Sequence, residues 1–382
     1  MKAKSINGKS AEEIQSALLE SMADGFMPTL AIVFLSIKQD IGAVSNLLDQ
    51  RGITIFGATS SGEFTDGDMS NGGIAVLLLE IKTTNFKIFL QDYRDKDPEA
   101  LAREMTVSAK ELFNNPSFII SASINSRDPS EVLLGEPLVR AIESVAGKEV
   151  IIWGGRAGDD FEFNETLVFT NNQSTKRGIL MLVIDGDKIL LRGEAASGIK
   201  SVGTEKTLTR VKGNWVQEID NQPAAEMLLK YLGLKFTDEE AEAFYPKEGI
   251  MFTVSREKGD PVIRGVGIFN WKEKSFSSLG PIREGDKMRF CLPPDFEVVD
   301  EVRETAEKVQ REISHADALL MFSCVGRLGQ FGPLISDEID GVRKAFNVPM
   351  VGFFTYGEFG RTRNGNNELH TSTCCWVALK EK

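Results

Sequence analysis

Three times in this 382-residue chain an apolar strand ends in a glycine-rich loop that carries an acid. The three segments are ITIFGATSSGEF (53–64), VIIWGGRAGDDF (150–161) and PMVGFFTYGEFG (349–360). In the first and third, two glycines lie five residues apart and Glu-Phe follows at once. In the second, Gly154 and Gly158 are one residue closer, and Asp159 and Asp160 follow. A supersecondary unit that recurs in this way predicts one structural solution used three times.

Each loop also follows a helical stretch and another apolar strand with a polar end: LAIVFLS, FIISASINSRD and ALLMFSCVGR. Glycine lets the backbone take positive φ and approach a ligand closely, and loops at strand ends are where binding groups collect. A single glycine-rich turn with one acid is more often only a tight turn. Three matched copies favour a shared binding site over that simpler interpretation.

The alternation of helices and strands in these units, separated by runs of short strands, predicts a mixed α/β (α+β) fold. We expect two domains of helix-covered sheets with a repeated strand-helix-strand-glycine-loop unit. Between residues 196 and 222 the chain is rich in glycine and in charged residues, which is typical of a domain border. The sequence thus predicts an N-terminal domain over 1–205 and a C-terminal domain over 206–382.

Charge and composition exclude several classes of protein. With 56 acidic against 44 basic residues and no basic cluster, the chain is not expected to bind nucleic acid. Its apolar runs are too short to span a bilayer, and its first residues lack the apolar stretch of a signal peptide. We therefore expect a cytoplasmic protein without membrane insertion, whose four cysteines are reduced thiols.

Polar side chains at the ends of the repeated strands are the candidate ligand-binding residues, because neighbouring strand ends lie at one edge of a sheet. Guanidinium groups bind carboxylates and acids receive ammonium groups, so the set suits a small zwitterionic or anionic ligand. An ion-pair network that only orders the loops remains an equal alternative. The candidates are Ser60, Ser61, Gly62, Glu63, Arg127, Gly155, Arg156, Asp159, Asp160, Ser323, Cys324, Arg327, Tyr356, Gly357, Glu358 and Arg361.

No pattern of catalytic residues stands out. The first loop lacks the Gly-x-Ser-x-Gly elbow of hydrolases, and Cys324 with His370 has no supporting motif. We therefore expect no catalytic residue and no enzyme. An enzyme that acts on a small substrate through Glu63, Glu358 or Cys324 is the alternative, and a pure interaction module is another. His370 is interpreted either as a structural histidine or as a ligand of haem iron.

Several of these motifs resemble those of the FIST (F-box and intracellular signal transduction) family. They are SGEF in the first unit, GGRAGDD in the second, and FSCVGR, GFFTYGEFG and LHTST in the third. The resemblance covers residues 25 to 380 and includes both the N-terminal and the C-terminal FIST modules. It implies a sensory protein that binds a small ligand and regulates a separate signalling partner.

Two ligands follow from the resemblance. Some family members are NosP-type haemoproteins that sense nitric oxide and act on a histidine kinase, which would make His370 the iron ligand of a non-covalent haem b. The family usually has asparagine after this histidine, whereas this chain has Thr371. An amino acid is the alternative ligand.

Overall fold

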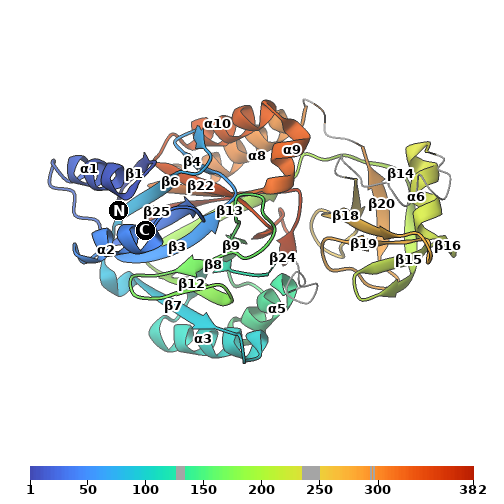
Figure 1. Cartoon of the computed structure of the whole chain (residues 1–382), viewed down its shortest axis with the longest axis horizontal. Coiled ribbons are helices and arrows are strands. Elements are labelled where there is room, and N and C mark those ends of the chain that lie inside the picture. The colour runs from blue at the N-terminus through green and yellow to red at the C-terminus, as the bar shows by residue number, and fades with distance from the viewer. Residues whose placement is uncertain (126–133, 235–249, 293–294, 296) are drawn as a thin grey trace.

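A computed structural model describes residues 1–125, 134–234, 250–292, 295 and 297–382. These residues form two bodies side by side: a larger one with three mixed sheets, and a smaller one built by residues 201–291 (Figure 1). The predicted mixed α/β fold in two domains is confirmed. None of the helices in the described ranges combines the length and the apolar character needed to cross a membrane.

The larger body repeats one order of elements three times. The first repeat contains β1 (Lys2–Gly8), α1 (Ala11–Ser21), β2 (Leu30–Ser36), α2 (Ile41–Asp49), β3 (Thr54–Ser60), β4 (Glu63–Thr65), β5 (Asp68–Ser70) and β6 (Ile74–Glu80). The second contains η1 (Thr83–Asn85), β7 (Phe86–Asp92), α3 (Pro98–Leu112), β8 (Pro116–Ala122), α5 (Gly135–Ala146), β9 (Ile152–Arg156), β10 (Val168–Phe169), β11 (Ser174–Thr175) and β12 (Gly178–Asp185). The third contains β13 (Ile189–Ala196), α8 (Glu297–Ile313), β21 (Ala318–Cys324), α9 (Val325–Phe331), α10 (Leu334–Phe346), β22 (Met350–Thr355), β23 (Glu358–Arg361), β24 (Asn367–His370) and β25 (Cys374–Glu381).

Each repeat builds the greater part of one sheet. The strand that leads into the glycine loop pairs in parallel with the strand before it: β3 with β2, β9 with β8, and β22 with β21. The last strand of each repeat, β6, β12 or β25, runs antiparallel between that pair and the first strand of the repeat. Helical crossovers join the parallel strands, as a parallel connection requires.

Both faces of the three sheets are covered, which explains why their strands read as continuous apolar runs. In β2, Leu30, Ile32 and Phe34 face a core shared by all three sheets, while Ala31 and Val33 pack under α1 and α2. The same division places α3 and α5 over the second sheet, and α8 and α10 over the third. The phenylalanines of different sheets meet in the shared core, where the rings of Phe34 and Phe353 lie 4.3 Å apart.

The hairpin that follows each glycine loop leaves its own repeat and joins the sheet of another. Hairpin β4–β5 pairs with β22 of the third sheet, β10–β11 pairs with β3 of the first, and β23–β24 pairs with β9 of the second. The exchange is cyclic, so each sheet gives one hairpin and receives one. We call this arrangement the exchange ring.

The first glycine of each loop is required by close packing at the exchange. A Cβ atom on Gly57 would lie 2.3 Å from the ring of Phe169, and one on Gly352 would lie 2.1 Å from the ring of Phe64. Both phenylalanines belong to the hairpin received from another repeat. At Gly154 the φ angle is +147°, and a Cβ atom would lie 1.9 Å from the carbonyl oxygen of Ile120. These glycines are therefore explained by packing alone.

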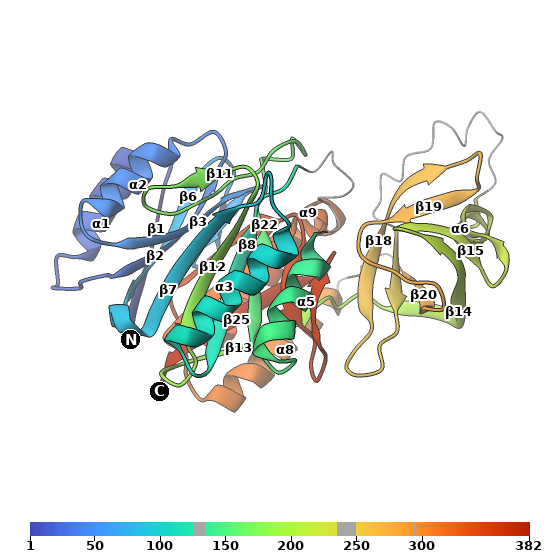
Figure 2. The ribbon, with the colours of Figure 1, turned by 90° about the horizontal axis from the view of Figure 1, so that it is seen from below.

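The smaller body is a barrel inserted between β13 and α8. It contains β14 (Ser201–Lys212), β15 (Trp215–Ile219), β16 (Gln222–Pro223), α6 (Ala224–Leu232), β17 (Met251–Val254), β18 (Val262–Asn270), β19 (Ser275–Ser278) and β20 (Lys287–Cys291). The strand order is β14-β20-β17-β18-β19-β15-β16, and pairing of β14 with β15 closes it. Apolar side chains such as Phe252, Phe276 and Met288 fill the interior. Figure 2 shows the barrel standing apart from the three sheets in a second view.

Because the barrel is inserted, the two bodies do not correspond to the two halves of the chain. The border that the sequence predicts between residues 205 and 206 lies within β14, and β21 to β25 complete sheets together with strands from the first half of the chain. The two visible bodies are thus residues 201–291 and the remainder.

Candidate functional site

The glycine loops, which the sequence singled out, meet in the larger body and hydrogen-bond to one another through their backbones. In the first contact, Ser61 N donates to the carbonyl of Phe354 (3.1 Å) and Phe354 N donates to that of Gly62 (2.9 Å). The other two contacts are Gly158 N to Thr59 O (2.8 Å) with Asp160 N to Ser60 O (3.0 Å), and Arg156 N to Gly357 O (2.8 Å) with Tyr356 N to Arg156 O (3.3 Å). The three loops therefore lie together in the larger body.

Strand register makes Glu63, Asp160 and Glu358 equivalent, because each lies six residues after the first glycine of its loop. Glu63 is fully buried and accepts hydrogen bonds from the Ser60 hydroxyl, from Ser70 Oγ (3.1 Å) and from Gly73 N (3.0 Å). Burial raises its pKa to about 7, although these donors act to lower it. Both carboxylate oxygens of Glu63 therefore accept hydrogen bonds from the protein itself.

The acids of the second loop are held in a similar way. Asp159 accepts from the backbone N–H groups of Phe163 (3.0 Å) and Asn164 (2.7 Å), and from the hydroxyl of Tyr356. Asp160 accepts from Ser36 Oγ at 2.6 Å. These contacts fix the loop against β2 and against the third glycine loop.

The third loop places a buried carboxylate beside a buried guanidinium and a thiol. The Thr355 hydroxyl donates to Glu358, whose pKa is raised by burial and lowered in part by Thr355, Arg156 and Cys324. Burial lowers the pKa of Arg156 to about 10 and raises that of the Cys324 thiol. Ser323 is fully buried on the same strand as Cys324. Within this cluster a protonated thiol is a weak nucleophile.

Arg327 and Glu338 form a fully buried ion pair behind this cluster. The guanidinium binds both carboxylate oxygens, with Nε at 3.1 Å from Oε1, and it also donates to the carbonyls of Ser197 and Ser372 at 2.9 Å. All five N–H groups of arginine suit such a site because they lie in a fixed plane. Arg327 therefore ties α9, α10 and the end of β13 together.

Of the remaining candidates, Gly155 lies within the loop contacts, where it pairs with Glu358. Gly155 packs against Thr355, whose Cγ2 would be 2.5 Å from an added Cβ, while Arg361 lies on β23 and donates to Asn367 Oδ1 (3.1 Å) and Val150 O (3.0 Å). Arg127 lies outside the described residues. His370 is on β24, directly opposite Glu358 in the antiparallel pairing of β23 with β24.

The surroundings of His370 bear on its proposed role as an iron ligand. It is buried, and its Nε2 lies 3.2 Å from the carbonyl oxygen of Gly360. Burial lowers its pKa to about 4, so the ring is neutral near pH 7. Neither of the two pockets described below is lined by His370. In the described part of the chain, no three His, Cys, Asp or Glu side chains are grouped so as to hold a metal ion.

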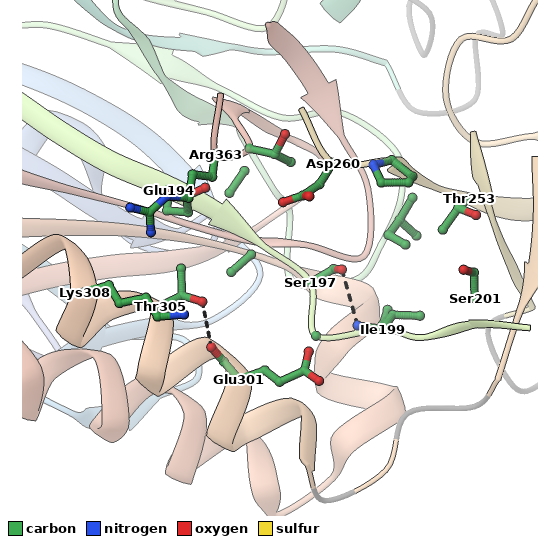
Figure 3. A pocket seen from close by; sticks show the side chains of 16 residues that line it. Glu194, Ser197, Ile199, Ser201, Thr253, Asp260, Glu301, Thr305, Lys308 and Arg363 are labelled. Atoms are coloured by element: carbon green, nitrogen blue, oxygen red, sulfur yellow. Dashed lines mark hydrogen bonds between the residues drawn. The ribbon is translucent and has the colours of Figure 1, made fainter. Parts of the chain in front are cut away.

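A pocket of about 370 Å³ lies where the barrel joins the larger body. Figure 3 shows side chains reaching it from the end of β13, from α8 and from barrel strands β14 and β17. The lining residues are Glu194, Ala195, Ala196, Ser197, Gly198, Ile199, Ser201, Thr253, Asp260, Pro261, Ile263, Glu301, Thr305, Lys308, Thr362 and Arg363. A second, more open pocket is lined by Asp49, residues 52–54 and residues 170–173.

Glu194 is the distinctive group of the pocket between the barrel and the larger body. It is 3% exposed, and its Oε2 accepts no hydrogen bond from any described residue. Burial raises its pKa to about 7, Arg192 and Arg363 act to lower it, and Asp260 and Glu312 act to raise it. In Figure 3, Glu194, Arg363 and Asp260 lie near one another, opposite Lys308 and Glu301 of α8. The sequence analysis did not predict this pocket. The glycine-rich, charged composition that begins near residue 196 did mark the junction where the pocket lies, and ligand pockets often occur at domain junctions.

The barrel is also held to the larger body by ionic contacts. Arg256 donates to both oxygens of Glu368 (2.7 and 2.6 Å), and the buried Arg264 lies 3.4 Å from the same carboxylate. Burial acts to raise the pKa of Glu368, but the two arginines hold it below its ordinary value. Thr371, next to His370, donates to the carbonyl of Ile263 at 3.1 Å. We call the contact of Arg256 and Arg264 with Glu368 the arginine clamp.

Two protein-family models match the chain. The FIST N domain matches residues 29–222 and the FIST C domain matches residues 224–361, which together span most of the chain. The chain belongs to the FIST family. FIST domains are sensor domains of signal transduction. No curated protein matches the chain.

The two FIST modules share the barrel. FIST N ends at residue 222 in β16, and FIST C begins at residue 224, where α6 starts. FIST N therefore contributes β14 and β15, and FIST C contributes β17 to β20. The pocket is lined by both FIST modules, with Glu194 from the first and Asp260 and Lys308 from the second.

Proposed function

We propose that this FIST protein senses a small polar molecule bound in the pocket between the barrel and the larger body. The observation that carries the proposal is Glu194, a buried carboxylate whose Oε2 has no hydrogen-bond partner among the described residues and which lines a 370 Å³ pocket. A buried polar atom without a partner is unfavourable, and a bound ligand would remove that penalty. The volume falls in the range of pockets for small ligands.

The charges of the pocket favour a ligand that carries both an ammonium and a carboxylate group. Glu194, Asp260 and Glu301 can accept hydrogen bonds from an ammonium, while Lys308 and Arg363 can donate to a carboxylate. A free amino acid has both groups. It is the ligand class we propose.

Binding in the pocket would be transmitted through the barrel. Residues 197–200 are one of the two crossings that join the barrel to the larger body, and Ser197 and Ile199 line the pocket. The arginine clamp is a second contact between the same two bodies. A ligand that touches both bodies would change their relative position, as in other hinge-type sensors. We propose that a separate signalling protein, such as a histidine kinase, reads this change.

A thermal-shift measurement with a panel of free amino acids tests the ligand proposal. A ligand at about one hundred times its Kd stabilises the folded protein by about 2.7 kcal/mol, which is a shift of several degrees. We expect one or more compounds to raise Tm, and Glu194→Gln and Lys308→Met to abolish the shift. Glu304→Gln, on the exposed side of α8, is the matched control and should respond like the wild type. If no amino acid raises Tm, or both pocket variants respond normally, the proposal fails.

Haem-based sensing of nitric oxide through His370 is the competing ligand proposal, and it comes from the family alone. It requires His370 to leave its contact with Gly360, because Nε2 is engaged there. An absorption spectrum after incubation with hemin distinguishes the two. A Soret band that disappears in His370→Ala would favour haem over the pocket ligand. A protein that stays colourless after incubation with hemin would overturn the haem proposal.

We also propose that the bound ligand is not converted. Glu63 is surrounded by three donors, and the pKa of the Cys324 thiol is raised by burial, so neither is prepared for catalysis. Mass spectrometry of the ligand after prolonged incubation should recover it unchanged. Consumption by the wild type, lost in Glu358→Gln or Cys324→Ser, would instead support an enzyme.

A further inference from the structure

The second glycine loop continues into a short segment with two exposed phenylalanines. Phe161 is 47% exposed and Phe163 is 46% exposed, and their ring centroids lie 6.4 Å apart. We call this pair the aromatic ridge. Single exposed apolar residues are ordinary, but neighbouring aromatic rings form a surface of the kind used in protein contacts.

The backbone of the ridge is in an unfavourable conformation. Asp160, Phe161 and Phe163 have φ angles of 53°, 67° and 48°, in the left-handed region. Aspartate tolerates this region, whereas bulky side chains are rarely found there. A loop that only had to turn would place glycine or asparagine at these positions. Such local strain tends to persist where it orients groups for function.

Several contacts hold the two rings in their outward positions. Asp159 accepts from Phe163 N and from the Tyr356 hydroxyl, and the Tyr356 ring stacks on Phe163 with centroids 4.7 Å apart and planes 11° apart. Phe161 N donates to Ser61 Oγ at 3.4 Å. The ridge is thus attached to the exchange ring at its base and is preorganised, which reduces the entropy lost when it binds a partner.

Acidic residues surround the ridge in the segment DDFEFNE. Glu162 lies between the two phenylalanines, and Asp160 and Glu165 flank them. Lys38 reaches Asp160 at 3.5 Å and Lys176 reaches Glu165 at 2.7 Å, so these two acids are paired, and Glu162 is the exposed acid that has no ion pair among the described residues. Nucleic acid and anionic lipid would be repelled by these carboxylates. A second copy of the chain, with net charge -12, would bring the same acids face to face about a twofold axis.

We propose that the aromatic ridge is a docking surface for an arginine-bearing segment of a partner protein. A guanidinium stacks on the face of a phenylalanine ring and at the same time donates to a neighbouring carboxylate. Arginine and aromatic residues are enriched among the residues that dominate binding energy at protein interfaces. The ridge lines neither pocket, so this surface is independent of the proposed ligand site.

A random peptide library displayed on phage tests the proposal without knowledge of the natural partner. The immobilised wild-type protein is used for selection, and the selected peptides are synthesised and measured by fluorescence anisotropy. We expect enrichment of arginine next to apolar residues, and a Kd at least about tenfold weaker for Phe161→Ala. Glu162→Lys should weaken the same peptides, because it reverses the charge between the rings.

The matched control is Leu112→Ala, which removes an apolar side chain that is 54% exposed on α3. It should bind the peptides like the wild type, and thermal melting should show that all three variants are folded. Peptides that lack basic residues, or that bind Phe161→Ala and the wild type equally, would overturn the proposal. A concentration-dependent dimer in sedimentation that Phe161→Ala abolishes would assign the ridge to self-association instead, and would also overturn it.

Discussion

Glu63 in the exchange ring and Glu194 in the interdomain pocket are two buried carboxylates with different surroundings. Burial raises the pKa of each to about 7. Glu63 is met by three donors from its own repeat, whereas Oε2 of Glu194 has no donor among the described residues. A raised pKa therefore does not by itself identify a binding site. The useful difference is whether the fold supplies the hydrogen bonds.

The contrast does not extend to every acid of the ring, because Oε2 of the buried Glu358 also has no hydrogen-bond partner among the described residues, but Glu358 lines neither of the two pockets. In the exchange ring, the repeated glycines and acids close one sheet against the next. The pocket lies where the repeat is interrupted, at the point where the barrel enters between β13 and α8. Substitutions in the ring should therefore change stability, while substitutions in the pocket should change stability little or in the opposite direction.

The largest effect is expected from breaking the buried ion pair beside the ring. Glu338→Ala leaves the Arg327 guanidinium buried without its carboxylate and should lower the free energy of unfolding by about 3–5 kcal/mol. Urea unfolding measures this change. Asp337→Ala, at the neighbouring exposed position, should stay within about 0.5 kcal/mol. The double variant Arg327→Met/Glu338→Leu should recover part of the loss, and a double variant as unstable as Glu338→Ala would contradict this account.

Gly352→Ala should have the next largest effect. The added Cβ would lie 2.1 Å from the Phe64 ring and 2.3 Å from the carbonyl oxygen of Met321, so the received hairpin has to move. We expect a loss of about 3 kcal/mol in urea unfolding, the upper end of ordinary overpacking. In Gly329→Ala, the new Cβ meets nothing within 4 Å in a helix, and a gain of up to about 1 kcal/mol is expected. Equal effects in the two variants would show that the exchange is not tightly packed.

Glu194→Gln should change the pH dependence of stability. The folded pKa of about 7 lies above the ordinary value of 4.5, so between these values the native chain keeps a proton that the unfolded chain releases. The stability from this group is complete below about pH 4.5 and is lost as the pH rises through 7. The neutral amide should therefore be more stable than the wild type at pH 8, by on the order of 2 kcal/mol.

Urea unfolding from pH 5 to 8 measures the difference between the two proteins. Glu63→Gln is the informative partner, because it disturbs three hydrogen bonds as well as removing a charge. It should gain less at pH 8 than Glu194→Gln and should lose stability at pH 5. If both variants gave the same pH profile, the difference drawn between the ring and the pocket would not hold.

The smallest effect on stability is expected for Lys308→Met. Lys308 is exposed at the edge of the pocket, so its removal should change the free energy of unfolding by less than about 0.5 kcal/mol. The same variant should lose the amino-acid response in the thermal-shift measurement. A large change in stability, combined with an intact response, would place Lys308 among structural residues.

Part of this architecture is legible in the sequence. The run LAIVFLS predicts a strand because its alternate residues pack on opposite faces and both faces are buried. The recurring glycine loops likewise predict one unit used three times. Their joint position at strand ends follows from parallel pairing, which needs no knowledge of distant contacts.

Neither the exchange of hairpins nor the pocket could be predicted from the sequence. Nothing local distinguishes pairing of Phe64 with Gly352 from pairing within its own repeat, because the register depends on how three sheets meet. Glu194 lies in an ordinary alternating strand, and its burial depends on Trp376 opposite and on a barrel inserted after residue 200. The sequence predicts the glycine loop that leads into the aromatic ridge but not the ridge itself, because φ angles cannot be read from a sequence.

The cyclic exchange of hairpins also sets conditions on how the chain folds. No repeat can complete its sheet until a hairpin from another repeat has arrived, and β4 must pair with a strand nearly three hundred residues later, as Gly352 opposite Phe64 illustrates. Contacts of such long sequence separation slow folding, and the open edges of β3, β9 and β22 are exposed meanwhile. A hairpin from a second molecule can fill any of these edges as well as the chain's own. Crowded refolding should therefore produce interlocked oligomers, each joined by the same pairs that close the single molecule.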